Sequence, residues 1–321
     1  MQLSRAIRGF LLARSADGLS ENTLIDYERT LRTVAAFLAD PDIEAVTTDD
    51  LRRYLDHLRR DYVPTRMSGD ASPLSPKTIK NHWIALASFY KWAARELGVD
   101  NALAGIKPPQ TSQATVEPFT QDEVQAILKA CERTKTASTE QRLPFTMRRP
   151  TAARDRALIL LLLDTGLRAS ECAKLTVGDV DLGTGEVTVK GFGSGRKSRP
   201  RHVYLGRVSR TALWRYLGQR EDGEDASAPL FVSVDSRPMN RTSIRQLCKK
   251  LGTRAGVSRC YPHRFRHTFA ITYLRNGGDV FTLQRLLGHS SLDMVQRYVR
   301  LASADDAAAH RKASPADNWR L

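Results

Sequence analysis

Four side chains near the C-terminal end of the chain have the types and spacing to act together on a phosphate ester. His263 and Arg266 stand three residues apart, so a helix would place them on one face about a turn apart. His289 follows Gly288, a residue type that commonly ends a helix, and Tyr298 comes nine residues later. Arginine binds phosphate oxygens with a planar, permanently charged fork, whereas a tyrosine hydroxyl attacks when neighbours stabilise its phenolate. The pattern therefore predicts attack by a hydroxyl on a phosphodiester.

Ordinary structural roles compete with this interpretation. A lone histidine is more often a satisfied core residue, and most tyrosines at helical spacing are half-buried packing residues. His267 fits such a packing or supporting role. A metal site would need a third ligand beside His263, His267 and His289, and no carboxylate or cysteine has an obvious spacing for it. The catalytic role, with no metal, is favoured because two imidazoles, a guanidinium and a phenol occur together in this pattern.

A second arginine motif lies upstream. The chain reads Thr-Gly-Leu-Arg-Ala-Ser-Glu from Thr165 to Glu171, directly after the apolar segment 157–163, which indicates a buried helix. Arg168 would then lie at the start of the next helix, with Glu171 three residues on as an ion-pair partner. An ion pair and a catalytic role are compatible, because a reactive arginine needs a neighbour that aims it.

The motifs T-G-x-R-x-x-E, H-x-x-R and L-L-G-H, followed by Tyr298, resemble the signature of the tyrosine recombinase (phage integrase) family, with a slight preference for simple Xer-like or transposon enzymes. The resemblance covers most of residues 155–300. It implies a metal-free transesterification that uses no cofactor: two arginines clamp a DNA phosphate, two histidines serve as donors or acid–base groups, and the tyrosine forms a 3′-phosphotyrosyl link. The residues that match these roles are Arg168, Arg266, His263, His289 and Tyr298.

The resemblance also implies a lysine at the tip of a β-hairpin, which protonates the departing 5′ oxygen. Residues 187–190 and 202–205 read as the two strands. When the loop is aligned from its N-terminal end, Gly191-Phe192-Gly193 stands where the family usually has Gly-Lys-Gly, and the loop is longer than usual. Aligned from the right, Arg196 or Lys197 takes the lysine position. We favour Lys197, which lies nearest the tip, and keep Lys190 as an alternative.

The elements that must position these residues fall into two domains. Residues 1–107 read as helices only and resemble the family's SAM-like core-binding domain, so we expect four helices that close one side of a clamp around DNA. Residues 108–118 have the composition of a linker, and residues 119–302 would form a mixed α+β catalytic domain. Residues 303–321 are a tail available for contact with a neighbouring protomer. The expected fold class is mainly α with a small antiparallel β-sheet.

Composition independently indicates a polyanionic partner. The chain has 50 Lys plus Arg against 35 Asp plus Glu, a formal charge of +15. Such an excess is typical of proteins that contact phosphates. The basic, threonine-rich segment 133–151 is either a surface loop or a DNA-backbone contact. The resemblance implies that the partner is double-stranded DNA with an inverted-repeat core site, bound on two synapsed duplexes by a homotetramer or by a heterotetramer with a paralogue.

Four scattered cysteines lack C-x-x-C spacing and indicate neither a zinc site nor a disulfide framework, which fits a reducing cytosol. The apolar run 157–163 is too short to cross a bilayer, and the N-terminus lacks the pattern of a secretion signal. We therefore expect a cytoplasmic, nucleoid-associated protein. Two other functions stay open: a type IB topoisomerase-like monomer that reseals the same strand, and a non-catalytic DNA-binding protein with a decayed site.

Overall fold

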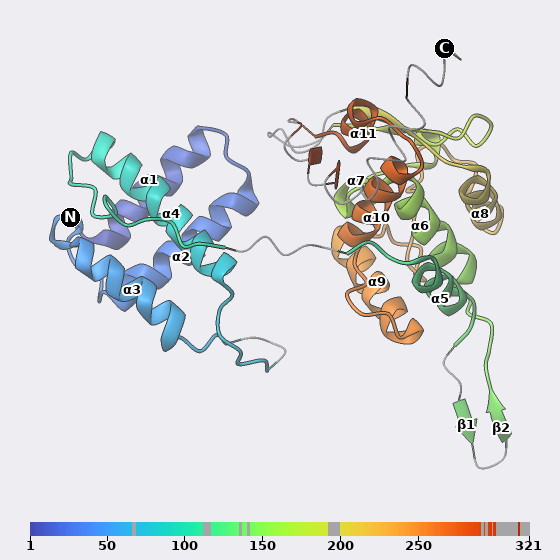
Figure 1. Cartoon of the computed structure of the whole chain (residues 1–321), viewed down its shortest axis with the longest axis horizontal. Coiled ribbons are helices and arrows are strands. Elements are labelled where there is room, and N and C mark those ends of the chain that lie inside the picture. The colour runs from blue at the N-terminus through green and yellow to red at the C-terminus, as the bar shows by residue number, and fades with distance from the viewer. Residues whose placement is uncertain are drawn as a thin grey trace. The chain divides into compact units, whose positions relative to one another are not determined.

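The chain folds into two compact units, one formed by residues up to 114 and the other essentially by residues from 115 on. The computed structural model describes residues 1–65, 69–111, 117–134, 137–139, 142–191 and 200–289, together with residues 292, 295, 296, 298, 299 and 314. Figure 1 shows the whole chain. None of the described helices is long and apolar enough to cross a membrane.

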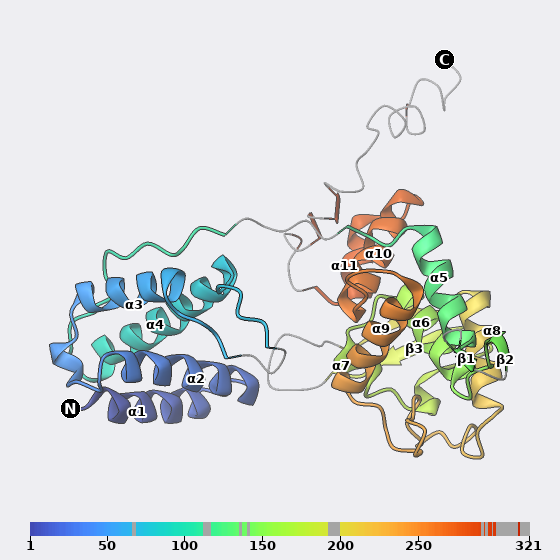
Figure 2. The ribbon, with the colours of Figure 1, turned by 90° about the horizontal axis from the view of Figure 1, so that it is seen from below.

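The first unit is helical, as expected. It contains α1 (Leu3–Ala16), α2 (Glu21–Phe37), α3 (Thr48–Arg60) and α4 (Pro76–Glu96), with a short 3-10 turn at Ile43–Ala45. Helix α3 begins with a capping box between Thr47 and Asp50, and α4 begins with Ser75 as cap and Pro76 in the first turn. Helix α4 packs against the other three, and Figures 1 and 2 show α1 and α2 side by side.

Aromatic residues form the centre of this unit. Phe10 is fully buried and makes edge contacts with Phe89 and Trp92. At the edge of this core, the Tyr54 hydroxyl lies 2.7 Å from Nδ1 of His82. Burial lowers the pKa of His82 to about 4, so its ring is neutral at pH 7. The unit therefore has a core of its own, with a neutral histidine bonded to one of its buried tyrosines.

Helix α6 (Ala152–Thr165) lies at the centre of the second unit, because its stretch 157–163 is apolar all round. Six consecutive residues, 157–162, are buried, so the helix has no solvent face there. It packs against α5, α8 and α10 (Figure 1). The remaining helices of the unit are α5 (Gln121–Glu132), α7 (Ala169–Cys172), α8 (Arg207–Leu217), α9 (Arg241–Ala255), α10 (Pro262–Arg275) and α11 (Val280–Leu287), with a 3-10 turn at Val177–Asp179.

Two antiparallel strand pairs complete this unit. Strands β3 (Glu186–Val189) and β4 (Arg201–Tyr204) pair in the register Glu186 with Tyr204 and Val189 with Arg201. Each strand is displaced by one residue from its predicted bounds, and both lie where the hairpin was expected. The segment 133–151, which the sequence does not assign, contains the short strands β1 (Ala137–Thr139) and β2 (Arg142–Phe145). The fold is mainly α with small antiparallel sheets, which confirms the predicted class.

Candidate active site

Gly166 redirects the chain at the end of α6 and thereby places Arg168. Its φ of 60° lies in the left-handed region, and a Cβ atom there would come within 2.6 Å of the Phe269 ring. Only glycine satisfies both constraints. Arg168 then becomes the residue that caps α7. The predicted position of Arg168, after a buried helix and before a short one, is the position in the structure.

A buried carboxylate holds Arg168 from one side and a second arginine from the other. Glu171 accepts from Nη1 of Arg168 at 2.9 Å and from the Arg168 backbone N–H at 2.8 Å. Two nitrogens of Arg201, on β4, donate to the same carboxylate at 3.0 and 2.9 Å. Burial alone would raise the pKa of Glu171, but the hydrogen bonds and charges of Arg201 and Arg168 hold it below its usual value. Glu171 is therefore ionised and aims Arg168.

Arg201 was not among the residues selected from the sequence. Its Nε donates to the backbone carbonyl of Leu286 at 2.6 Å, so one guanidinium ties β4 to the end of α11 as well as to Glu171. The alternation along β4 carried a usable signal: Arg201 stands two residues before buried Val203 and so shares its inward face. An inward-facing arginine needs a buried partner, and Glu171 is that partner.

Arg266, on α10, is the most deeply buried charge near this network, with 1% of its surface exposed. It donates to the carbonyls of Gly166 at 2.9 Å and Leu287 at 2.6 Å, and to Nε2 of His289 at 2.8 Å. Burial, reinforced by the charge of Arg168, lowers the pKa of Arg266 to about 9. That value stays above neutral pH, so the guanidinium remains charged.

The hydrogen bond from Arg266 fixes the protonation of His289. A guanidinium can only donate, so Nε2 of His289 must accept and the ring proton must sit on Nδ1. Burial and the charge of Arg266 lower the pKa of His289 to about 3, so the ring is neutral at pH 7. Within the described part of the chain, Nδ1 of His289 and Nε of Arg266 are both buried without a hydrogen-bond partner. Both atoms are donors, so the positively charged site holds two N–H groups that can bind an anion.

Tyr298 lies against the histidines, with 4% of its surface exposed. Its ring centre is 5.4 Å from that of His267 and 6.3 Å from that of His289, and the rings of Tyr298 and His289 are nearly parallel. The rings of His263 and His267 are 4.4 Å apart. Helices α10 and α11 pack against each other and lie together in Figures 1 and 2, and the charge of Arg168 acts on both Arg266 and His289. The structure therefore gathers the predicted arginines, histidines and tyrosine into one place.

Of the two candidate hairpin lysines, the structure describes Lys190, which is paired elsewhere. Nζ of Lys190 lies 2.7 Å from a carboxylate oxygen of Asp179, in an ion pair at the other end of β3 from Glu186. Lys197 lies outside the described residues. Nearly all of the tail from 303 to 321 also lies outside them. In the described ranges, no group of three or more His, Cys, Asp or Glu residues is placed to hold a metal ion.

Comparisons with known proteins show the family of the chain. The phage integrase family model matches residues 117–305, and the phage integrase N-terminal SAM-like domain matches residues 10–97. The chain is 32% identical to tyrosine recombinase XerC of Pelobacter propionicus, covering 98% of this chain and 96% of that protein. It is 30% identical to tyrosine recombinase XerD of Oceanobacillus iheyensis, covering 94% and 95%. The chain therefore belongs to the phage integrase family.

The fold is also that of a known integrase. The Tn1549 transposon integrase, solved in complex with circular intermediate DNA, superposes with a TM-score of 0.73 over 98% of this chain and 99% of that one, at 20% identity. Such a likeness shows the fold alone. With the family established by the relatives, the protein is a tyrosine-type site-specific recombinase. The topoisomerase-like and binding-only alternatives are not favoured by these comparisons.

Proposed function

We propose that this recombinase cuts and rejoins double-stranded DNA through a covalent link to Tyr298, with Arg168, Arg266, His263 and His289 around the reacting phosphate. The Tyr298 oxygen forms a bond to phosphorus while the bond from phosphorus to the 5′ oxygen breaks. The products are a 3′-phosphotyrosyl link and a free 5′-hydroxyl. One phosphoester replaces another, so the step is reversible and needs no energy source, and a 5′-hydroxyl from a partner strand can complete the exchange.

The observation that carries this proposal is the pair of buried donors without acceptors, Nε of Arg266 and Nδ1 of His289. Leaving buried donors unpaired costs about 1–3 kcal/mol each, so a site that does so needs a ligand that repays it. A phosphate group offers several oxygens that can accept from such donors. Its negative charge grows as the tyrosine attacks, so donors held rigidly by Gly166, Leu287 and Glu171 bind the transition state more tightly than the ground state.

The two predicted histidines have different roles in this proposal. A neutral His289 whose Nε2 is engaged by Arg266 supplies a hydrogen bond and is no proton carrier at neutral pH. Acid–base chemistry at the phosphate is assigned to His263, as the resemblance to the family implies, and the ring of His267 contacts the rings of both His263 and Tyr298. The departing 5′ oxygen needs a proton donor. Lys197 is preferred over Lys190 for that role, because Lys190 is held by Asp179.

The oligomeric state, location and domain limits are proposed from the same chemistry and from the relatives. Strand exchange between two duplexes requires four active tyrosines, so we propose a tetramer on an inverted-repeat DNA site. A net charge of +15 suits a protein that works on the nucleoid in the cytoplasm. The proposed reaction involves no metal and no cofactor. The domain limits proposed for it are residues 1–107, 119–302 and a tail from 303, with residues 108–118 as the tether.

Covalent capture tests this mechanism. The protein is incubated with sheared genomic DNA from its source and denatured in SDS, and the ends of protein-linked fragments are sequenced. We expect fragments that converge on one inverted-repeat site, and no linked DNA from Tyr298→Phe, whose DNA affinity should stay within about twofold because only a hydroxyl is lost. Linked DNA from Tyr298→Phe, or an equal loss of binding and linkage, would exclude Tyr298 as the nucleophile.

A further inference from the structure

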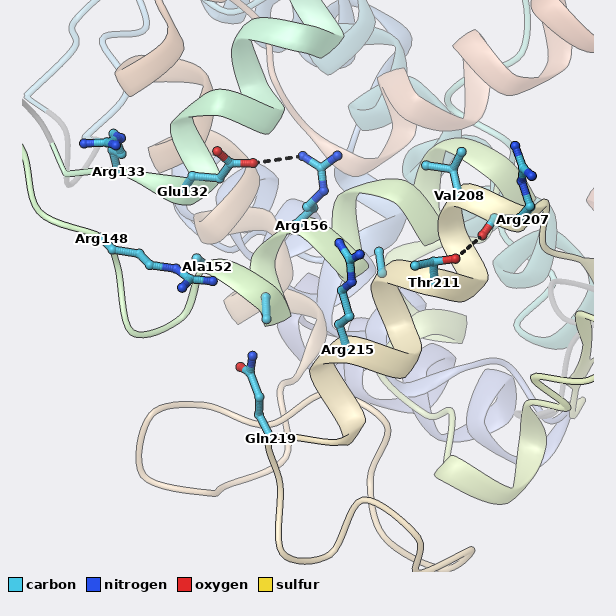
Figure 3. Close-up of a pocket in the computed structure, with 12 residues that line it drawn as sticks. Glu132, Arg133, Arg148, Ala152, Arg156, Arg207, Val208, Thr211, Arg215 and Gln219 are labelled. Atoms are coloured by element: carbon cyan, nitrogen blue, oxygen red, sulfur yellow. Dashed lines mark hydrogen bonds and ion pairs between the residues drawn. The ribbon is translucent and has the colours of Figure 1, made fainter.

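A cleft of about 840 Å³ in the second unit is lined by arginines from three separate segments of the chain. It lies where the end of α5, the base of the β1–β2 hairpin, the first turn of α6 and the length of α8 meet (Figure 3). We call it the arginine cleft, and its arginines are Arg133, Arg148, Arg156, Arg207 and Arg215.

Most of this charge has no carboxylate beside it. Among the described lining residues the acidic side chain is Glu132, which accepts from Arg156 at 3.2 Å. Arg133 donates to the hydroxyl of Thr146 at 3.1 Å. The other three arginines have no ion-pair partner in the part of the chain that the structure describes. One glutamate against five arginines leaves four net positive charges on the walls of one cleft.

The local geometry makes that charge costly without a ligand. The backbones of Arg133 and Arg148 pair in an isolated antiparallel bridge, which fixes both residues at the edge of the cleft. Figure 3 shows Arg148 and Arg215 pointing toward the middle of the cleft from different elements. Alanines at 152 and 212 line it, so an anion can come close to the helices. An anion with several charges would relieve the repulsion.

None of the residues that line the arginine cleft belongs to the active site. The cleft reaches from the first turn of α6 to Arg207, which lies beside the last turn, because the N–H of Gly206 donates to Asp164 there. The helix has 14 residues, so at about 1.5 Å per residue the end of the cleft at the first turn lies about 21 Å along the helix from its last turn. A ligand that reaches that end therefore extends well beyond the phosphate that Tyr298 attacks.

We propose that the arginine cleft binds the phosphate backbone of DNA outside the segment held at Tyr298. The inference rests on the proposed function, since it takes DNA as the ligand of the chain. Arginine forks fit phosphate oxygens, and duplex DNA offers about one phosphate charge per 1.7 Å along its axis, enough to reach several arginines of the cleft together. The exposed walls suit a long polymer that passes along the surface. This role also explains the basic composition of segment 133–151.

The salt dependence of DNA binding tests the inference. A labelled 45-base-pair duplex of arbitrary sequence is titrated with the full chain over a series of salt concentrations. In the cleft variant, Arg148→Gln, Arg207→Gln and Arg215→Gln are combined. The matched control removes three exposed charges of the same unit outside the cleft, through Arg237→Gln, Lys250→Gln and Arg285→Gln. We expect the slope of log Kd against log salt to fall by about 2–3 in the cleft variant, because each lost phosphate contact removes about 0.9.

Equal slopes for the cleft variant and the wild type, or an equal fall in the control, would overturn the inference. A melting curve for each variant establishes that it is folded. Tripolyphosphate is a further probe: if it raises the melting temperature of the wild type while the DNA slope of the cleft variant is unchanged, the ligand is a small polyphosphate and the DNA assignment fails. Covalent capture is measured separately. If the wild type forms no covalent link to DNA, the proposed function is rejected, while the salt dependence of DNA binding still tests the arginine cleft.

Discussion

At the scale of single residues, the charge of a side chain in this site is set by its neighbours. His289 and His263 look equivalent in the sequence, yet the structure makes His289 a neutral acceptor toward Arg266 and a donor through Nδ1. The sequence predicted which residue types gather. It could not predict the tautomer, because that depends on a hydrogen bond from Arg266, which lies 23 positions away.

The depressed histidine pKa values predict how stability depends on pH. His82 and His289 have pKa values of about 4 and about 3, below the ordinary 6.5, so between these limits the unfolded chain binds protons that the folded chain does not. Their contribution is complete above pH 6.5 and is lost as the pH falls, by about 1.4 kcal/mol per pH unit for each histidine. Urea unfolding at pH 7.5 and pH 5.0 should show a fall in the free energy of unfolding.

The variant His82→Gln isolates one of these contributions. Glutamine keeps a polar side chain toward the Tyr54 hydroxyl but does not titrate. The variant should be less stable than the wild type at pH 7.5, and the fall between the two pH values should be smaller by about 2 kcal/mol. Parallel losses in variant and wild type would mean that His82 titrates normally in the folded protein.

At the scale of elements, the helix starts could be predicted because they are encoded locally. Thr47 and Ser75 cap α3 and α4 within three residues of sequence. Arg201 could not be selected that way, because its partners Glu171 and Leu286 lie 30 and 85 positions away. The pairing of β4 with β3 brings it to them, and the neighbouring loop carries the favoured lysine. Strand β4 thus connects that loop, Arg168 and the end of α11.

This connection predicts a positioning role for Arg201. Arg201→Met removes two hydrogen bonds to Glu171 and the bond to the end of α11. A misplacement of a reacting group by 1 Å can cost about 100-fold in rate, so we expect covalent linkage at saturating DNA to slow by about tenfold or more. DNA affinity should stay within about twofold of the wild-type value. Arg201→Lys keeps the charge without the fork and should recover only part of the rate. The exposed Arg237→Met should match the wild type. Equal losses of affinity and rate would indicate a merely structural role.

At the scale of the whole molecule, the described residues of the two units form separate hydrophobic cores, and the second unit adds a smaller cluster that includes Leu283, Leu287 and Tyr298. The first centres on the aromatic residues of α1 and α4 and the second on α6, so each unit buries its own apolar surface. Chain length, helical periodicity and the resemblance to the family predicted two domains, with a helical stretch and a mixed stretch on either side of a segment rich in proline and small polar residues. Contacts between side chains that are far apart in the sequence, in contrast, could be found only from the folded structure.

Separate cores predict separate unfolding. Phe89 is fully buried against Phe10 and Trp92, and Phe89→Ala should destabilise the first unit by about 3–5 kcal/mol through lost contacts and a cavity. Peptide-resolved hydrogen exchange should then show faster exchange in α1 to α4, while α5, α6 and α10 exchange as in the wild type. Leu158→Ala, at the centre of α6, should give the opposite pattern. Faster exchange in both units of either variant would mean that the cores unfold as one, and that the tether does not isolate the domain that carries Tyr298.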